Sequence, residues 1–245
     1  MVSKSNAKFI KSLQLKKYRK QEQCFLVEGA KSVLEVVQSD FIVQQVIATE
    51  SFTSQHEATL KNIETLLTTE KQLTALGTLK NNDTALAVVR MKDDIPLTLQ
   101  SDDWYIALDD VNDPGNLGTI LRIADWYDIP RVICSEQTAD AYNPKVIAAS
   151  KGSFCRTQVW YASLDEVLRE TEMKIYGAVM EGESVHTTTF DKGGILVMGN
   201  EANGISDTIL QRVTDRITIP RYGQAESLNV AMATAIICDN IKRGR

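Results

Sequence analysis

Short apolar blocks alternate with blocks of helical period in the first part of the chain. The segments "CFLVEG" (24–29) and "VQQVIAT" (43–49) predict buried strands, and "AKSVLEVVQS" (30–39) predicts a helix between them. The same alternation returns in "KQLTALG" (71–77) and "TALAVVRM" (84–91), where this part of the chain ends. The pattern predicts a small N-terminal unit of mixed strands and helices.

A polar stretch without periodicity follows this unit. Residues 92–103, "KDDIPLTLQSDD", combine four acidic residues with a proline and no regular apolar spacing, which is typical of a linker. We therefore expect one domain over residues 1–95, a linker over 96–103 and a second domain over 104–245.

Beyond the linker, apolar blocks of strand length recur between blocks of helical period. Strands are predicted within 104–111, 131–136, 174–182, 193–200 and 216–220, and helices within 118–128, 143–150, 205–213 and at the C-terminal end. Such repeated alternation predicts an α/β domain with a largely parallel sheet. In these sheets ligands bind at the carboxyl ends of the strands, in the loops that lead into helices.

The composition is that of an ordinary globular protein, with 43% hydrophobic and 24% charged residues. The longest apolar run, 230–238, has nine residues, whereas a membrane span needs roughly 18. The N-terminus lacks the apolar core of a signal peptide. We therefore expect a cytoplasmic protein without a membrane segment.

Cysteine and histidine usage argues against both disulfides and a metal site. The cysteines are scattered without a C-x-x-C pair, and His56 and His186 lie far apart in polar surroundings. Reduced thiols and no metal are the expectation. The four cysteines are Cys24, Cys134, Cys155 and Cys238.

The net charge of −5 hides an asymmetry along the chain. Residues 1–95 hold 13 basic and 11 acidic side chains, whereas residues 96–245 hold 14 and 21. The first 20 residues contain seven basic side chains and no acidic one. On charge alone, this cluster is either a solvated helix face or a surface that attracts phosphates. Its candidates for phosphate contact are Lys8, Lys11, Lys16, Lys17, Arg19 and Lys20.

Two loops that follow predicted strands are unusually rich in polar residues and glycine. The first, "DDVNDPGNLGTILRIAD" (109–125), places Arg122 inside an otherwise apolar helix, where a guanidinium needs a solvent edge or an anionic partner. The second, "ILVMGNEANGIS" (195–206), ends an apolar strand at Gly199, whose missing side chain would let a ligand approach the backbone. A turn followed by a capped helix explains most of the same letters.

A third loop lies in "ITIPRYGQAESLNVAMATAIICDNIKR" (217–243), where capping-type residues gather at the start of an apolar helix. Ser227 or Glu226 alone would cap the helix. Two or three such residues exceed what a cap requires, and free helix N–H groups also attract anions. None of the three loops forms the G-x-G-x-x-G element of a dinucleotide-binding fold.

These three segments together resemble a known family. "NDPGNLGTILRIA", "LVMGNEANGIS" and "IPRYGQAESLNVAMA" are similar, in order and spacing, to the three motifs of the SpoU (TrmH-like) RNA 2′-O-ribose methyltransferases of the SPOUT superfamily. The resemblance covers about residues 104 to 243. "FLVEGAKSVLEVVQS" resembles the small RNA substrate-binding domain, similar to ribosomal protein L30e, that precedes the catalytic domain in many members.

The resemblance implies a function. Members transfer the methyl group of S-adenosylmethionine to a ribose 2′-hydroxyl of tRNA or ribosomal RNA, hold the cofactor in a trefoil knot, and usually form homodimers. It implies catalytic roles for Asn116, Arg122, Glu201, Ser227 and Asn229, and cofactor contacts for Gly199, Ile219 and Leu228. Beside such a domain, the N-terminal basic cluster is expected to contact RNA, and ribosomal RNA is the first expected substrate, with tRNA second.

The chain departs from the family pattern at two positions of the third motif. Arg221 replaces the usual methionine, and Ala231 stands where serine is frequent. Neither position removes an expected catalytic group, but Arg221 bears on the choice of substrate. Two alternatives stay open at this point: a ribosome-associated RNA-binding protein without activity, and a nicotinamide-dependent oxidoreductase, which the missing glycine-rich element disfavours.

Overall fold

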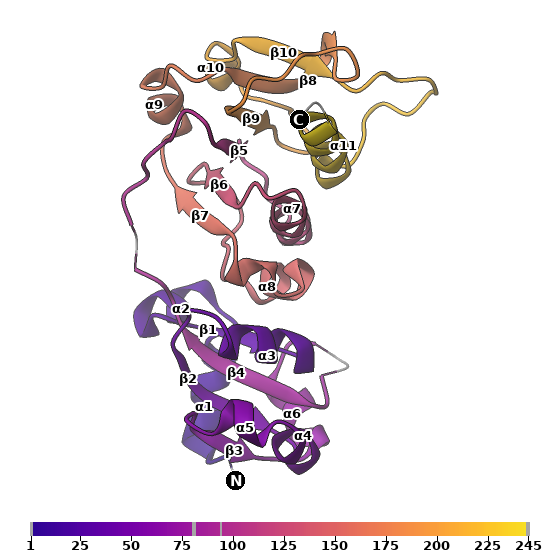
Figure 1. Ribbon diagram of the computed structural model, residues 1–245. Coiled ribbons are helices and arrows are strands. Elements are labelled where there is room, and N and C mark those ends of the chain that lie inside the picture. Colours follow the sequence, from indigo (N-terminus) through magenta and orange to yellow (C-terminus); the bar gives the residue numbers. More distant parts are fainter. Residues whose placement is uncertain (1, 80–81, 94, 244–245) are drawn as a thin grey trace. The chain divides into compact units, whose positions relative to one another are not determined.

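The computed structural model describes residues 2–79, 82–93 and 95–243, and the chain forms two compact units (Figure 1). The first unit comprises residues up to Asp93 together with Asp140–Cys155. The second comprises Asp94–Ala139 and the chain from Arg156 onward. Each unit has its own sheet and its own apolar core, and each is described separately.

The first unit contains a mixed four-stranded sheet in the order β1-β4-β2-β3. Its strands are β1 (Cys24–Glu28), β2 (Val43–Ala48), β3 (Thr65–Leu67) and β4 (Ala85–Arg90). Strand β4 runs antiparallel to both neighbours, and β2 and β3 are parallel. Its helices before β4 are α1 (Lys4–Ser12), α2 (Lys16–Glu22), α3 (Ala30–Val37), α4 (Glu50–Gln55), α5 (Glu57–Leu60) and α6 (Glu70–Leu76).

Strand β1 is apolar over its first four residues and ends at the buried Glu28. Alternate residues of a strand point to opposite faces of the sheet. Phe25 and Val27 pack into one apolar cluster, and Cys24 and Leu26 pack into a second. Because both faces of the strand are covered, no polar position alternates along it. The expected strands at 24–29 and 43–49 and the helix at 30–39 are therefore confirmed, within a residue or two at their ends.

Residues 140–155 join the first unit although they follow the first strands of the second sheet in sequence. They form α8 (Pro144–Ser150) and the 3-10 turn η1 (Ser153–Cys155). Helix α8 packs against β1, and Ile147 and Phe154 are buried in the cluster that contains Phe25. The helix was predicted from its periodicity, but its place in the first unit was not.

The second unit contains a six-stranded sheet in the order β10-β8-β9-β5-β6-β7, in which every pair is parallel. The prediction of a largely parallel α/β domain is confirmed. Its strands are β5 (Trp104–Leu108), β6 (Arg131–Cys134), β7 (Gln158–Tyr161), β8 (Ile175–Ser184), β9 (Gly194–Met198) and β10 (Asp215–Thr218).

Helices cover both faces of this parallel sheet, as buried strands require. Helices α7 (Pro114–Trp126) and α11 (Val230–Arg243) pack side by side, and α9 (Leu164–Arg169) contacts α10 (Asp207–Leu210) on the other side (Figure 1). Helix α7 begins four residues earlier than the apolar period predicts, because Asp113 caps it by accepting a hydrogen bond from the Asn116 N–H at 3.0 Å. Pro114 at the first helical position fixes this start.

The stretch predicted as a linker has no regular secondary structure in its described residues, yet two of its side chains pack against the second unit. Leu97 and Leu99 contact the apolar cluster around Tyr105, and the Tyr105 hydroxyl accepts a hydrogen bond from the Gln100 N–H at 2.8 Å. Among the described residues, no helix is long and apolar enough to cross a membrane.

Candidate active site

The carboxyl ends of β5 and β9 meet at one edge of the second sheet, because the two strands are paired neighbours. The Asp109 N–H donates to the Met198 carbonyl at 2.9 Å, which extends the pairing into the loops. The Asn200 side-chain amide then donates to the Asp110 carbonyl at 2.7 Å. These hydrogen bonds hold the first and second motif loops together.

A chain of three side chains joins all three motifs. The Asn116 amide Nδ2 donates to Glu201 Oε1 at 2.8 Å, and the Asn229 Nδ2 donates to Asn116 Oδ1 at 2.9 Å. Asn116 therefore uses both ends of its amide, and its orientation is fixed from both sides. Residues 85 and 113 positions away from it in sequence converge on this one side chain.

The Glu201 carboxylate lies at the N-terminal end of α7. It also accepts long hydrogen bonds from the N–H groups of Asn112 and Asp113, at 3.5 and 3.4 Å. A negative charge is favourable there because of the free N–H groups and the helix dipole. The Glu201 carboxylate therefore holds the first motif loop in place through these hydrogen bonds.

Asn229 has a second role at the start of α11. Its Oδ1 accepts hydrogen bonds from the N–H groups of Ala231 and Met232, at 3.0 and 3.3 Å. The alternative that Ser227 or Glu226 is a simple cap for this helix is excluded, because α11 begins at Val230 and the Asn229 side chain provides the cap. Ser227 and Glu226 lie exposed in the preceding loop, where they contribute no cap.

Arg122 lies on α7 with an exposed side chain. Of the two environments that the sequence allowed for a guanidinium in an apolar helix, the structure shows the solvent edge. Arg122 forms no hydrogen bond or ion pair with any residue that the structure describes. Its charge is therefore available to an anionic ligand.

The fold of the loop requires glycine at position 199, with or without a ligand. A Cβ atom at this position would lie 2.1 Å from the Gly204 carbonyl carbon and 2.2 Å from the Ile205 nitrogen. Gly204, in turn, adopts a φ of 69°, which glycine tolerates best, and pairs with Asn200 through two backbone hydrogen bonds of 2.9 Å. The two glycines thus permit a tight loop directly above β9.

The loop from Arg221 to Asn229 offers backbone groups to a ligand. Its residues are exposed, and none of their backbone N–H groups donates a hydrogen bond within the described part of the chain. Ile219 is half-buried just before the loop, and Leu228 is 49% exposed within it. Polar backbone beside apolar side chains suits a ligand such as S-adenosylmethionine, which combines a hydrogen-bonding base with apolar faces.

The sequence did not single out the residues that hold the first loop. Asp110 adopts a φ of 58°, a left-handed conformation that is uncommon for a residue other than glycine. The Ser135 hydroxyl donates to the Asp110 carboxylate at 2.5 Å and accepts from the Asp110 N–H at 2.9 Å. In the sequence, Asp110 could have been noticed only as one of two aspartates directly after a predicted strand, a pattern that is typical of a turn.

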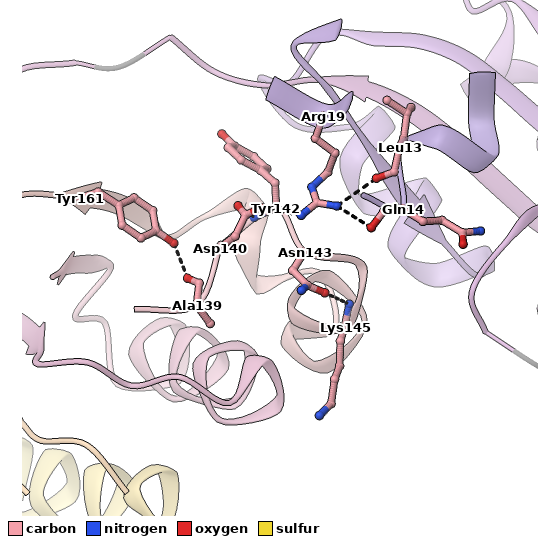
Figure 2. Close-up of polar contacts among 9 residues, drawn as sticks. All are labelled: Leu13, Gln14, Arg19, Ala139, Asp140, Tyr142, Asn143, Lys145 and Tyr161. Carbon is pink, nitrogen blue, oxygen red and sulfur yellow. Dashed lines mark hydrogen bonds and ion pairs between the residues drawn. The ribbon is translucent and has the colours of Figure 1, made fainter. Parts of the chain in front are cut away.

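The N-terminal basic residues do not share one environment. The Arg19 side chain is 2% exposed and pairs with Asp140, so the expectation that Arg19 contacts RNA is corrected: its charge is already bound inside the first unit (Figure 2). The five lysines of the cluster are exposed on or near α1 and α2: Lys8, Lys11, Lys16, Lys17 and Lys20.

All four cysteines are free thiols. Burial raises the pKa of the Cys238 thiol to about 12 and raises the pKa of Cys134 further still. Such thiols stay protonated at neutral pH and are poor nucleophiles. In the part of the chain that the structure describes, no three His, Cys, Asp or Glu side chains cluster in a way that could hold a metal.

The fold and the comparisons with known proteins define an S-adenosylmethionine-dependent RNA methyltransferase. Residues 103–239 match the model of the SpoU rRNA Methylase family, and residues 4–87 match an MRM3-like substrate binding domain. The chain belongs to the SpoU rRNA methylase family.

Relatives match over nearly the whole chain. The chain is 30% identical over 236 residues to the 23S rRNA (guanosine(2553)-2'-O)-methyltransferase RlmP of Bacillus subtilis, covering 95% of this chain and 94% of the relative. A TrmH-family RNA methyltransferase structure from Porphyromonas gingivalis is 33% identical, with a TM-score of 0.86 and 99% of each chain covered. An AdoMet-bound rRNA methyltransferase from Sinorhizobium meliloti is 26% identical, with a TM-score of 0.88 over 99% of this chain and 97% of that one.

Replacing Asn116 by alanine tests the chain of three side chains. Both amide hydrogen bonds would be lost, so methyl transfer should fall about 100-fold, as expected when reacting groups shift by about 1 Å. Because the site is exposed, the free energy of unfolding should fall by only about 1 kcal/mol. Thr119→Ala, on the same helix, is the matched control. Among the residues that the structure describes, the Thr119 hydroxyl bonds only to the Gly115 carbonyl of its own helix, at 2.8 Å. Equal activity in the two variants would contradict the role of Asn116.

Proposed function

We propose that this protein transfers the methyl group of S-adenosylmethionine to a ribose 2′-hydroxyl of large-subunit ribosomal RNA, with tRNA as the second candidate. The observation that carries the proposal is the Glu201–Asn116–Asn229 chain, which joins the three motifs, together with the exposed Arg122 on α7. The B. subtilis relative, which matches over almost its whole length, is named for 2'-O-methylation of 23S rRNA and supports the choice of substrate.

The catalytic roles are those that the family resemblance implies, and the geometry of the site supports them. Bound S-adenosylmethionine supplies an electrophilic methyl group. We assign its binding to the backbone around Gly199, Ile219 and Leu228. Ile219 and Leu228 lie beside or within the loop whose backbone N–H groups are exposed, and Gly199 is buried directly after β9. The Ser227 hydroxyl, exposed in the same loop, faces solvent and is assigned to the substrate side of the site.

Arg122 binds the nucleotide phosphate and stabilises the negative charge that develops on the 2′-oxygen during methyl transfer. A guanidinium keeps its proton far above neutral pH, so it is a poor base and a good electrostatic partner. Glu201 is also unsuited to remove the proton, because its carboxylate already accepts hydrogen bonds from Asn116 and from the loop backbone. The main contribution of the protein to catalysis is the alignment of the 2′-oxygen with the methyl group. Such alignment can lower the activation barrier of methyl transfer by about 7–11 kcal/mol.

The proposal includes the wider organisation expected from the family resemblance. Residues 1–95, onto which residues 140–155 pack, act as the substrate-binding domain, 96–103 as the linker and 104–245 as the catalytic domain, which forms a trefoil knot and a homodimer in the cytoplasm. The return of the chain from β10 through the exposed loop to α11, where Asn229 meets Asn116 of α7, supports a knotted path.

The exposed lysines of the first unit should contact RNA phosphates. Replacing Lys8, Lys11, Lys16, Lys17 and Lys20 by glutamine should weaken RNA binding and flatten the slope of log affinity against log salt by about one per lost contact. Filter binding of ribosomal RNA fragments between about 50 and 200 mM salt measures this slope. An unchanged slope would identify the cluster as a solvated helix face.

Methyl transfer from labelled S-adenosylmethionine tests the function directly. The protein is incubated with unmodified ribosomal RNA and tRNA pools, and 2′-O-methyl positions are then mapped. Incorporation at one ribose of 23S rRNA supports the proposal, and incorporation into tRNA alone moves the substrate to the second candidate. Cofactor binding without transfer to either pool would contradict both.

A further inference from the structure

The carboxyl ends of β1, β2 and β3 lie at one edge of the first sheet, because β2 and β3 are parallel and both β1 and β2 run antiparallel to β4. Each of these three strands leads into a helix, α3, α4 or α6. The Thr49 N–H donates to the Thr84 carbonyl at 3.1 Å, which joins the start of α4 to the residue before β4. The second sheet carries the candidate active site at the same kind of edge, where strands lead into helices.

A cavity of about 400 Å³ opens at this edge of the first sheet. All of its lining residues belong to the first unit. Ligand pockets in proteins begin at about 300 Å³, so this cavity accommodates one small organic group. The lining side chains that bear on binding are Ser51, Phe52, Gln55, His56, Glu70 and Asp83.

Two aromatic rings line the cavity. The Phe52 side chain is 3% exposed and belongs to the apolar core of the unit. The ring of His56, which is half-buried, lies 4.8 Å from the Phe52 ring, centroid to centroid, with 55° between the two planes. The imidazole forms no hydrogen bond with any residue that the structure describes. Because Phe52 is fixed in the core, it holds the His56 ring in place as a flat surface, and RNA bases stack on such rings.

Glu70 brings a free carboxylate to the same cavity. Its exposed side chain forms no hydrogen bond or ion pair with the described residues. The helix dipole alone favours an acid at the start of α6, and Glu50 occupies the same place in α4. Of these two glutamates, only Glu70 lines the cavity, where Asp83 adds a second carboxylate. Two carboxylates favour a ligand that donates hydrogen bonds and repel a phosphate group.

Guanine is the RNA base that suits this lining. Its Watson–Crick edge presents two adjacent donors, the N1–H and the N2 amino group, which one carboxylate accepts together. Uracil presents one donor between two acceptors, and adenine and cytosine present one donor beside an acceptor. The Gln55 amide and the Ser51 hydroxyl are exposed and have no partner among the described residues, so they can donate to the guanine O6.

We propose that this cavity binds a guanine base that is unstacked from the rest of the RNA substrate. The His56 ring is the stacking surface, and Glu70 accepts the hydrogen bonds of the Watson–Crick edge. The proposal rests on the proposed function, and residues 4–87, which contain the whole lining, match an MRM3-like substrate binding domain. Phosphate contacts carry no sequence information. The cavity therefore provides a selectivity that the exposed lysines of this unit cannot provide.

Binding of short RNAs to the full chain tests the base preference. The probes are single-stranded octamers of uridine whose fourth residue is guanosine, inosine or adenosine, and fluorescence anisotropy measures the Kd. We expect the guanosine octamer to bind about tenfold more tightly than the adenosine octamer, as one paired contact to a base edge allows. The inosine octamer should lie between them, because inosine lacks the N2 amino group. Equal affinity for the three octamers overturns the proposal.

The variant Glu70→Gln should bind the guanosine octamer about tenfold more weakly and should no longer distinguish guanosine from inosine. Removal of an acid ordinarily strengthens the binding of a polyanion, so a loss of affinity identifies a direct contact. Glu50→Gln is the matched control, because Glu50 also follows a capping threonine at the start of its helix but does not line the cavity. Its affinity should stay equal or rise slightly. Unchanged or stronger binding in Glu70→Gln overturns the proposal.

The variant His56→Ala should weaken the binding of all three octamers about tenfold, since the stacking surface is lost for every base. His56→Phe keeps a flat ring and should restore the affinity; binding that stays weak contradicts the stacking role.

Methyl transfer by the unaltered protein separates this proposal from the proposed function. Guanosine-selective binding without transfer to ribosomal RNA or tRNA would overturn the proposed function and uphold the cavity. Transfer without a preference for guanosine would overturn the cavity alone.

Discussion

Replacing Arg122 by alanine should abolish methyl transfer while leaving the affinity for S-adenosylmethionine nearly unchanged. The side chain is exposed and forms no hydrogen bond or ion pair within the described residues, so its removal disturbs no internal contact. Loss of one group that stabilises a developing negative charge costs about 10²–10³ in rate. Loss of the phosphate grip adds a further cost through poor alignment.

Single-turnover transfer to the mapped RNA, with cofactor affinity measured by calorimetry, checks this result. Arg216→Ala is a suitable control, because Arg216 is likewise exposed in the same unit but lies on β10. Transfer at the unaltered rate in Arg122→Ala would exclude Arg122 from catalysis, whichever role it is given.

The variant Arg122→Lys distinguishes an electrostatic role from that of a base. The pKa of lysine, about 10.4, lies well below that of arginine. If residue 122 removed the proton, the lysine variant should gain activity steeply as the pH approaches 10. If residue 122 acts through its charge, activity should show no such gain and should fall when the ammonium loses its proton.

Local patterns predicted the parallel sheet because β5 and β9 are apolar throughout and each is followed by a helical period. Strands β3 and β7 were missed, since they are short, lie at sheet edges and show mixed burial. The start of α7 was also missed, because Asp113 and Pro114 determine it rather than apolar spacing. Edge strands and helix caps depend on contacts with other residues, and the spacing of apolar residues gives no information about those contacts.

The site was predicted as a set of residues, but their contacts were not. Ser227 and Asn229 look equivalent as capping residues in the sequence, yet only Asn229 caps α11 and reaches Asn116. Arg19 looks like its lysine neighbours, yet its guanidinium is buried against Asp140, which lies 121 positions away. Such pairings arise from the tertiary fold, and charge patterning along the chain cannot distinguish them.

Gly199 provides the second large expected effect, because its neighbours are backbone atoms. In Gly199→Ala the new methyl group would lie 2.1 Å from the Gly204 carbonyl carbon and 2.5 Å from its oxygen. A flexible side chain could move aside, but the loop of residues 200–204 is closed by two hydrogen bonds between Asn200 and Gly204. We expect a loss of about 1–3 kcal/mol in the free energy of unfolding, typical of overpacking.

The same displacement would carry Glu201 away from Asn116, so Gly199→Ala should also lower cofactor affinity at least tenfold and transfer by more. Thermal unfolding, calorimetry and the transfer assay measure the three effects. Gly223→Ala is the matched control for stability alone, because a Cβ there meets nothing within 4 Å, whereas its loop is itself assigned to the cofactor. If Gly199→Ala lost stability but kept cofactor affinity, the tight loop above β9 would serve the fold alone. In that case the cofactor contacts assigned to Gly199 would have to come from the exposed loop before α11.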